Sequence, residues 1–186
     1  MRVTVTPITN FVEGLSEDER EELRDLAVRC FGPPAQRPPH PLTIAPDADT
    51  RFVVRVWDEG LLVSCLWITE RTILVDGQPV RAAGIRGVRT DPSKRRRGYA
   101  GAAMRHAEDF IWRELCPDLA MLHSSVMAVP FYESLGWRAI EGPVTCDQPS
   151  GKLEVSTALL QNPFMVIVPT GQELPRGPVD LCGLPW

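Results

Sequence analysis

Apolar and polar residues recur along this chain with helical spacing in some stretches and alternate in others. Leu23, Leu26, Ala27 and Cys30 follow one another at helical intervals, and Ser16 and Glu19 ahead of them have the form of a capping box. This pattern predicts a helix from Ser16 to about Phe31. A second helix is predicted from Gly98 to Cys116-Pro117. Its apolar residues share one broad face: Ala103, Met104, Ala107, Phe110, Ile111 and Leu115.

Alternating and continuous apolar runs predict the strands. These are Val3–Val5, Arg51–Trp57, Leu61–Arg71, Thr72–Val75, Val80–Thr90, Leu119–His123, Trp137–Ile140, Leu153–Leu160 and Phe164–Val168. Asp58-Glu59-Gly60 and Asp76-Gly77 are turn signals between neighbouring strands. A short helix is predicted between Pro130, at its first position, and Gly136, just past its end. The resulting order of elements predicts an α+β fold with a sheet of mixed direction.

Composition narrows the class of protein. The chain has 186 residues and a net charge of −4, so we expect one domain and no general attraction to nucleic acid. Six prolines between residues 33 and 46 exclude regular structure there. No apolar run is long enough to span a bilayer. The five cysteines are scattered without a Cys-x-x-Cys pair, so we expect reduced thiols, a cytoplasmic protein and no metal.

A basic segment joins the end of a predicted strand to the second helix. The strand ends at Asp91-Pro92, and the basic turn Lys94–Arg97 leads into Gly98. A helix N-terminus carries unpaired N–H groups and a partial positive charge, which suit an anion. The small residues Gly98, Ala100 and Gly101 would let a phosphate come close to the backbone. The sequence therefore predicts a pyrophosphate cradle, and the alternative is a solvated run of charge.

The spacing Arg95-x-x-Gly98-x-Ala100 resembles the acyl-CoA signature of the GNAT acyltransferase superfamily. Two further stretches are similar to that family: Thr90-Asp91-Pro92-Ser93-Lys94-Arg95, its strand exit, and Ala128-x-x-Phe131-Tyr132-x-x-x-Gly136-Trp137, its second signature. The resemblance covers about residues 50–160. It implies a single α+β domain over residues 1–186, with a mostly antiparallel twisted sheet, flanking helices and a V-shaped acyl-CoA cleft, followed by a C-terminal strand and tail over 161–186.

The same resemblance implies an N-acyltransferase that moves an acetyl group from acetyl-CoA, or another acyl group from its CoA ester, to a primary amine of a small molecule or peptide. The residues implied to bind the co-substrate are Val88, Thr90, Arg95, Arg96, Arg97, Gly98, Tyr99, Ala100 and Gly101. Tyr132 is implied as the general acid for the departing thiolate, since a phenol stays protonated at neutral pH. Its alternative role is that of a buried aromatic. Direct transfer in a ternary complex is expected, because no cysteine occupies a motif position.

Three residues are candidates for the acceptor side. Arg86 stands where many family members have a glutamate base, and strand parity puts it on one face with Val88 and Thr90. A guanidinium cannot act as a base, so Arg86 is expected to bind a substrate carboxylate or phosphate, unless it points outward. His123 is a candidate base acting through water, or a satisfied core histidine.

The third candidate is Trp186. The chain length and the tail ending at Trp186 resemble the aminoglycoside 2′-N-acetyltransferase branch, in which the C-terminal carboxylate reaches the acceptor site. This role requires the tail to fold back, and a frayed end is the alternative. Arg86 and Lys152 depart from the acidic pocket that such polycationic substrates need.

Other functions remain open. The chain could be a non-catalytic acyl-CoA-binding or regulatory module that kept the cradle, or an aminoglycoside N-acetyltransferase. A nucleic-acid binder using Lys94–Arg97 is disfavoured, because the run lacks interleaved aromatic residues and the whole chain is acidic. No membrane partner is expected, and a homodimer is left open.

Overall fold

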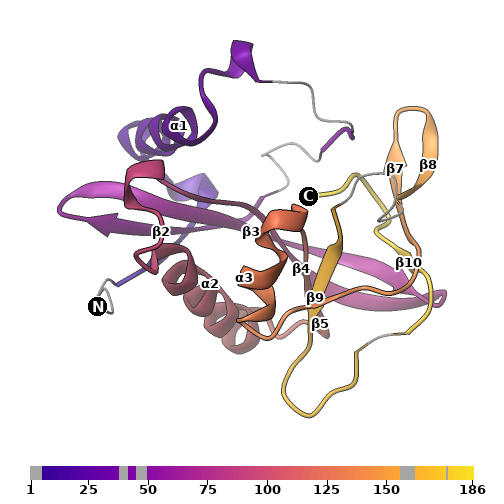
Figure 1. The fold of residues 1–186 in the computed structure, drawn as a ribbon. Helices are drawn as coiled ribbons and strands as arrows, with labels where there is room; N and C mark the ends of the chain where they lie inside the picture. The colour runs from indigo at the N-terminus through magenta and orange to yellow at the C-terminus, as the bar shows by residue number, and fades with distance from the viewer. Residues whose placement is uncertain (1–5, 38–41, 45–49, 156–161, 175) are drawn as a thin grey trace. The chain divides into compact units, whose positions relative to one another are not determined.

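The computed structural model describes residues 6–37, 42–44, 50–155, 162–174 and 176–186. Figure 1 shows the helices α1 (Glu17–Phe31), α2 (Tyr99–Phe110) and α3 (Val129–Glu133). The strands are β1 (Ile8–Phe11), β2 (Phe52–Asp58), β3 (Leu61–Val75), β4 (Gln78–Thr90), β5 (Leu119–His123), β6 (Arg138–Ala139), β7 (Val144–Gln148), β8 (Gly151–Val155), β9 (Phe164–Ile167) and β10 (Val179–Asp180). A π-helical segment, Ile111–Leu115, continues α2, and 3₁₀ turns occupy Val12–Gly14, Pro34–Gln36, Pro92–Lys94 and Val126–Ala128.

The chain forms two compact units. The first comprises residues 1–39, 50–68 and 86–110, and the second comprises residues 40–49, 69–85 and 111–186. Because the divisions fall inside β3 and β4, each of these strands gives one part to each unit.

In the first unit, β2 pairs antiparallel with β1 on one side and with β3 on the other. The predicted capping box of α1 is confirmed: Ser16 Oγ accepts from the Glu19 backbone N–H at 3.2 Å, and Glu19 Oε2 accepts from the Ser16 N–H at 2.8 Å. One buried cluster holds α1 to the sheet: Leu15, Leu23, Leu26, Val53, Leu62 and Cys65. On α2, Phe110 meets Phe52 edge-on at 4.9 Å, and His106 bonds the Thr9 hydroxyl at 2.9 Å.

In the second unit the strands follow the order β6-β9-β5-β4-β3-β10-β7-β8. The pairs β4–β5 and β10–β7 are parallel, and the pairs β5–β9, β6–β9, β7–β8 and β10–β3 are antiparallel. The parallel pairing of β4 runs from Ala82 opposite Leu119 to Ile85 opposite Leu122. The mixed, mostly antiparallel α+β sheet predicted from the order of elements is confirmed.

Several predicted bounds change in the structure. Leu61–Arg71 and Thr72–Val75 form the single strand β3, because neither Arg71 nor Thr72 interrupts an extended chain. Strands β7 and β10 were not expected, and a 3₁₀ turn occupies part of the proline-rich stretch. The predicted strand Val3–Val5 and the last five residues of Leu153–Leu160 lie outside the described residues. None of the described helices is long and apolar enough to cross a membrane.

Candidate functional site

The exit of β4, in the first unit, is fixed by a buried carboxylate. Asp91 is 4% exposed, and its Oδ2 lies 2.6 Å from Nε of Arg29, near the end of α1. Its Oδ1 accepts from the backbone N–H and the hydroxyl of Ser93 at 2.9 and 2.7 Å. Hydrogen bonding from Ser93, followed by that from Arg29, keeps the pKa of the Asp91 carboxyl below its ordinary value despite burial. The chain therefore leaves the sheet in one defined direction.

The backbone of the basic turn is shaped for close approach. Arg96 has φ 61° and Gly98 has φ 90°, so two left-handed residues flank Arg97 before α2 starts at Tyr99. Alternation of this kind turns successive N–H groups toward a common side. A Cβ built on Gly98 would meet no atom within 4 Å, so open space lies over the backbone there. This open space fits a bound phosphate. A side chain at position 98 would occupy the space that the phosphate needs.

The charges of the turn divide into two groups. Arg95, Arg96 and Arg97 are exposed, whereas Lys94 is half-buried, with Nζ 2.6 Å from Asp58 Oδ2. The Lys94 charge is therefore already paired. Arg105, one turn along α2, lies against Gly101: a Cβ on that glycine would be 3.3 Å from Arg105 Nη1. Sequence reasoning missed Arg105 as a fourth cation at the helix start, although its i+4 spacing from Gly101 was the available signal.

Tyr99 takes a different place from the one expected of a co-substrate ligand. It is 3% exposed, and its hydroxyl bonds the Asp58 carboxylate. Burial first, and then this hydrogen bond, raise the pKa of the Tyr99 phenol. Its side chain thus faces the protein, and only its backbone N–H remains to serve an anion.

Strand β4 has an irregular backbone directly after Arg86. Gly87 has φ 59°, so the regular alternation of β4 is interrupted between Arg86 and Val88. A Cβ on Gly87 would be 3.0 Å from the Trp67 ring, and the Arg89 guanidinium stacks on that ring at 4.2 Å. The Thr90 hydroxyl instead meets Ser64 Oγ at 2.9 Å. Arg86 itself is half-buried, and with Gly87 at a positive φ, strand parity alone does not place it on one face with Val88 and Thr90.

Tyr132 lies in the second unit, at the end of α3. Its ring packs against Phe131 at 5.0 Å and Trp137 at 6.4 Å, both edge-on. Gly136, with φ 93°, closes the helix and lets the Trp137 N–H return to the Tyr132 carbonyl at 3.1 Å. Burial raises the pKa of Tyr132 to about 12. The Tyr132 phenol is therefore protonated at neutral pH.

His123 ends β5 in the same unit. Its ring stacks on Phe164 at 4.6 Å, and Nε2 lies 3.2 Å from the Asn162 carbonyl oxygen. Because a carbonyl only accepts, Nε2 carries the proton in this contact and Nδ1 is the basic nitrogen. His40, in the proline-rich stretch, lies outside the described residues.

The tail folds back, and Trp186 docks on the sheet of the second unit. The indole is 4% exposed and covers Gly84, where a Cβ would be 2.6 Å from ring atoms Cδ2 and Cε2. Arg71 stacks over the ring at 5.2 Å and donates from Nη1 to the Leu184 carbonyl at 2.7 Å. The frayed-end alternative is therefore wrong. Arg71 was not singled out in the sequence, because its partner lies more than a hundred residues further along the chain.

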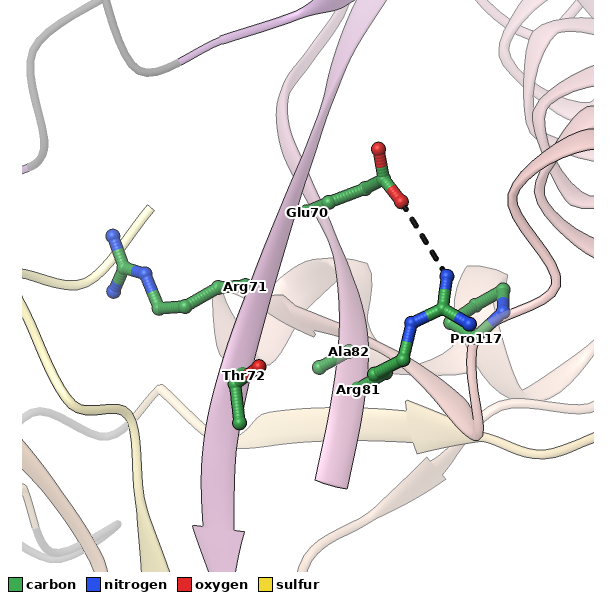
Figure 2. Close-up of a pocket in the computed structure, with 6 residues that line it drawn as sticks. All are labelled: Glu70, Arg71, Thr72, Arg81, Ala82 and Pro117. Carbon is green, nitrogen blue, oxygen red and sulfur yellow. Dashed lines mark ion pairs between the residues drawn. The ribbon is translucent and has the colours of Figure 1, made fainter. Parts of the chain in front are cut away.

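A separate pocket of about 220 Å³ lies beside the ends of β3 and β4 in the second unit. Figure 2 shows Glu70 and Arg81 turned toward each other on one side of β3, with Arg71 on the other. Arg81 Nη2 is 3.8 Å from Glu70 Oε1 and donates to the Leu115 carbonyl at 2.8 Å. Arg81 therefore caps the π-helical segment. The pocket is lined by Glu70, Arg71, Thr72, Arg81, Ala82 and Pro117. The residues described in this structure include no cluster of three metal-binding side chains.

Comparisons with known proteins agree with this architecture. Residues 12–140 match the family model described as "Acetyltransferase (GNAT) domain". No curated protein matches the sequence. Three solved structures are similar in fold, each at low sequence identity. An acyl-CoA N-acyltransferase from Pseudomonas aeruginosa has a TM-score of 0.62 at 15% identity, with 88% of this chain and 99% of that one covered.

The other two structures contain CoA or acetyl-CoA. The GNAT family N-acetyltransferase YhbS from Escherichia coli, in complex with CoA, has a TM-score of 0.58 at 13% identity, covering 100% and 98% of the two chains. A GNAT family acetyltransferase from Brucella melitensis, in complex with acetyl-CoA, has a TM-score of 0.55 at 12% identity, covering 94% of each. The comparisons lend no support to the aminoglycoside 2′-N-acetyltransferase branch. Since the family model spans well over half of its length, the chain belongs to the GNAT acetyltransferases.

Proposed function

We propose that this protein transfers an acetyl group from acetyl-CoA to a primary amine of a small molecule or peptide, by direct attack in a ternary complex. The observation that carries the proposal is the turn from Arg95 to Gly101 in a chain of this family. Exposed arginines, two left-handed residues and open space over Gly98 meet there at the start of α2. Each of these features favours a bound pyrophosphate.

Acyl-CoA supplies an activated thioester. The protein must hold the two substrates in position, protonate the leaving thiolate and accept a proton from the amine. The acceptor nitrogen bonds to the carbonyl carbon as the carbon–sulfur bond breaks. Tyr132 gives its proton to the departing sulfur, because burial keeps the phenol protonated across the physiological range. The ammonium proton must leave before attack. We assign His123 to accept that proton through an intervening water, because an imidazole is basic near neutral pH.

We propose that Arg86 binds the acceptor and takes no part in the proton transfers. Arg86 is half-buried, and a guanidinium can bind a carboxylate or phosphate through two parallel hydrogen bonds. Amines that also carry a carboxylate or phosphate are therefore expected to outperform polycationic aminoglycosides. Wild-type turnover of aminoglycosides with ordinary enzymatic efficiency would contradict this assignment of Arg86.

The proposal is tested first by binding. Gly98→Asp puts a like charge and a side chain where the phosphate approaches, and should weaken CoA binding at least about tenfold, or about 1.4 kcal/mol, in calorimetry. Gly171→Asp is the matched control, because Gly171 has φ 89° and also faces open space, but belongs to the second unit and is not part of the basic turn. Equal affinity of both folded variants would overturn the phosphate assignment.

Turnover is tested separately, by release of free CoA thiol in the presence of a panel of amines. Thiol release that depends on the added amine supports the transferase. Tight CoA binding without amine-dependent release from any member of the panel would favour the non-catalytic acyl-CoA-binding module instead.

A further inference from the structure

One carboxylate of the first unit bonds both ends of the basic turn. Asp58 is the last residue of β2. Its Oδ2 lies 2.6 Å from Lys94 Nζ, which precedes the three arginines, and the same carboxylate bonds the hydroxyl of Tyr99, the first residue of α2. Residues 95–98, which contain the two left-handed positions, therefore lie between two anchors on a single side chain.

These bonds differ from an ordinary surface ion pair. The side chains of Lys94 and Asp58 are only 19% and 21% exposed, and Tyr99 is 3% exposed. Glu59, the next residue, is 87% exposed and reaches Lys94 Nζ only at 3.9 Å. Exposed pairs contribute little, because water competes and two long side chains must be ordered. Asp58 ends β2, where the β2–β3 turn begins, so the strand holds its carboxylate in place. The carboxylate can therefore anchor the basic turn.

Direct electrostatics cannot explain an aspartate in this place. A carboxylate beside a phosphate-binding turn repels the phosphate, and by taking the Lys94 charge it removes one cation from the site. The bonds to Lys94 and Tyr99 do have a geometric effect, since they fix where the turn leaves the 3₁₀ segment Pro92–Lys94 and where α2 starts. Rigid N–H groups lose less entropy when an anion binds.

We propose that Asp58 is a positioning residue for acyl-CoA: through Lys94 and Tyr99 it holds the backbone of residues 95–98 in the form that receives the pyrophosphate. This inference rests on the proposed acyl-CoA function. It assigns Lys94 and the Tyr99 side chain to the support of the turn, and leaves phosphate contact to the backbone and the arginines.

The decisive experiment compares two neighbouring carboxylates. Asp58→Asn and Glu59→Gln remove the same charge, one residue apart. If Asp58 positions the turn, Asp58→Asn weakens CoA binding about tenfold in calorimetry, although the variant is less negative. Glu59→Gln leaves the dissociation constant within about twofold or lowers it. Asp58→Asn binding as tightly as wild type, or more tightly, would overturn the inference and indicate a purely electrostatic effect.

A second variant covers the case in which Asp58→Asn does not fold. Tyr99→Phe keeps the buried ring and removes one of the two anchors, and a several-fold weaker CoA affinity is expected. In both variants KM for acetyl-CoA should rise while kcat at saturation stays within about twofold, which general loss of structure would not produce. Unchanged KM in Tyr99→Phe contradicts the inference. Failure of the wild type to bind CoA would instead overturn the proposed function itself.

Discussion

Gly84 lies on β4 directly under the indole ring of Trp186, and replacing it by alanine tests how the tail is held. A Cβ at this position would be 2.6 Å from two ring atoms and 2.9 Å from Thr69 Cγ2. The ring has little room to retreat, because Arg71 stacks over it at 5.2 Å and is itself bonded to the Leu184 carbonyl. Overpacking of this kind costs about 1–3 kcal/mol. Gly84→Ala should therefore destabilise the wild-type protein by that amount.

The cost of Gly84→Ala should fall when the ring is removed. Trp186→Ala alone costs about 3–5 kcal/mol, because it empties a buried aromatic site. In that background the new methyl group of Gly84→Ala no longer meets the ring, and the backbone at Gly84 does not need a positive φ. The contact with Thr69 Cγ2 remains, but the emptied ring site leaves room for it to relax. Restriction of the unfolded chain offsets about 0.4–1 kcal/mol of the remaining cost.

Urea unfolding of the four proteins measures this coupling directly. The wild type, the two single variants and the double variant form a complete cycle, and the free energies of unfolding should give an interaction energy of at least about 1.5 kcal/mol. If Gly84→Ala costs the same with and without the indole, Trp186 does not cover Gly84 and the docked tail is refuted.

Three further outcomes are expected. Tyr132→Phe should lower kcat by about 10²–10⁴ with CoA affinity nearly unchanged; a kcat within about twofold of wild type would exclude Tyr132 as the acid. Burial raises the pKa values of Tyr132 and Cys65 to about 12 each, so stability should be fully present below about pH 8.5 and fall as pH rises through 12; a flat urea midpoint over that range would contradict this. Asp91→Asn should destabilise by about 1–3 kcal/mol, because Arg29 loses a largely shielded partner; wild-type stability in urea would show that the pair is dispensable.

The features predicted correctly from sequence are those that depend on neighbouring residues. The capping box of α1 needs only Ser16 and Glu19, and β5 was predicted with its observed bounds because the apolar run at 119–123 is short and sharply delimited. The start of α2 was predicted within one residue, since Gly98 marks it.

The features missed depend on distant partners or on one unusual dihedral angle. Gly87 interrupts β4 through its positive φ, which strict alternation cannot anticipate. Lys94 looked equivalent to Arg95 in sequence, but Asp58, thirty-six residues earlier, pairs its charge. Strand β10 has two residues, too few for a periodic signal, and is defined by its pairing with β3 and β7.

The position of β10 has a consequence for the order of events during synthesis. In the second unit, β10 lies between β3 and β7, so the β7–β8 hairpin joins the sheet through residues that are made after both of its own strands. Val179 opposes Val75, whereas every residue of the first unit has been made once Phe110 is added. The ribosome therefore presents a first unit able to fold early and a second that must wait. During that interval the edges of β3 and β7 stay unpaired, and they are the surfaces that a nascent-chain chaperone would have to shield.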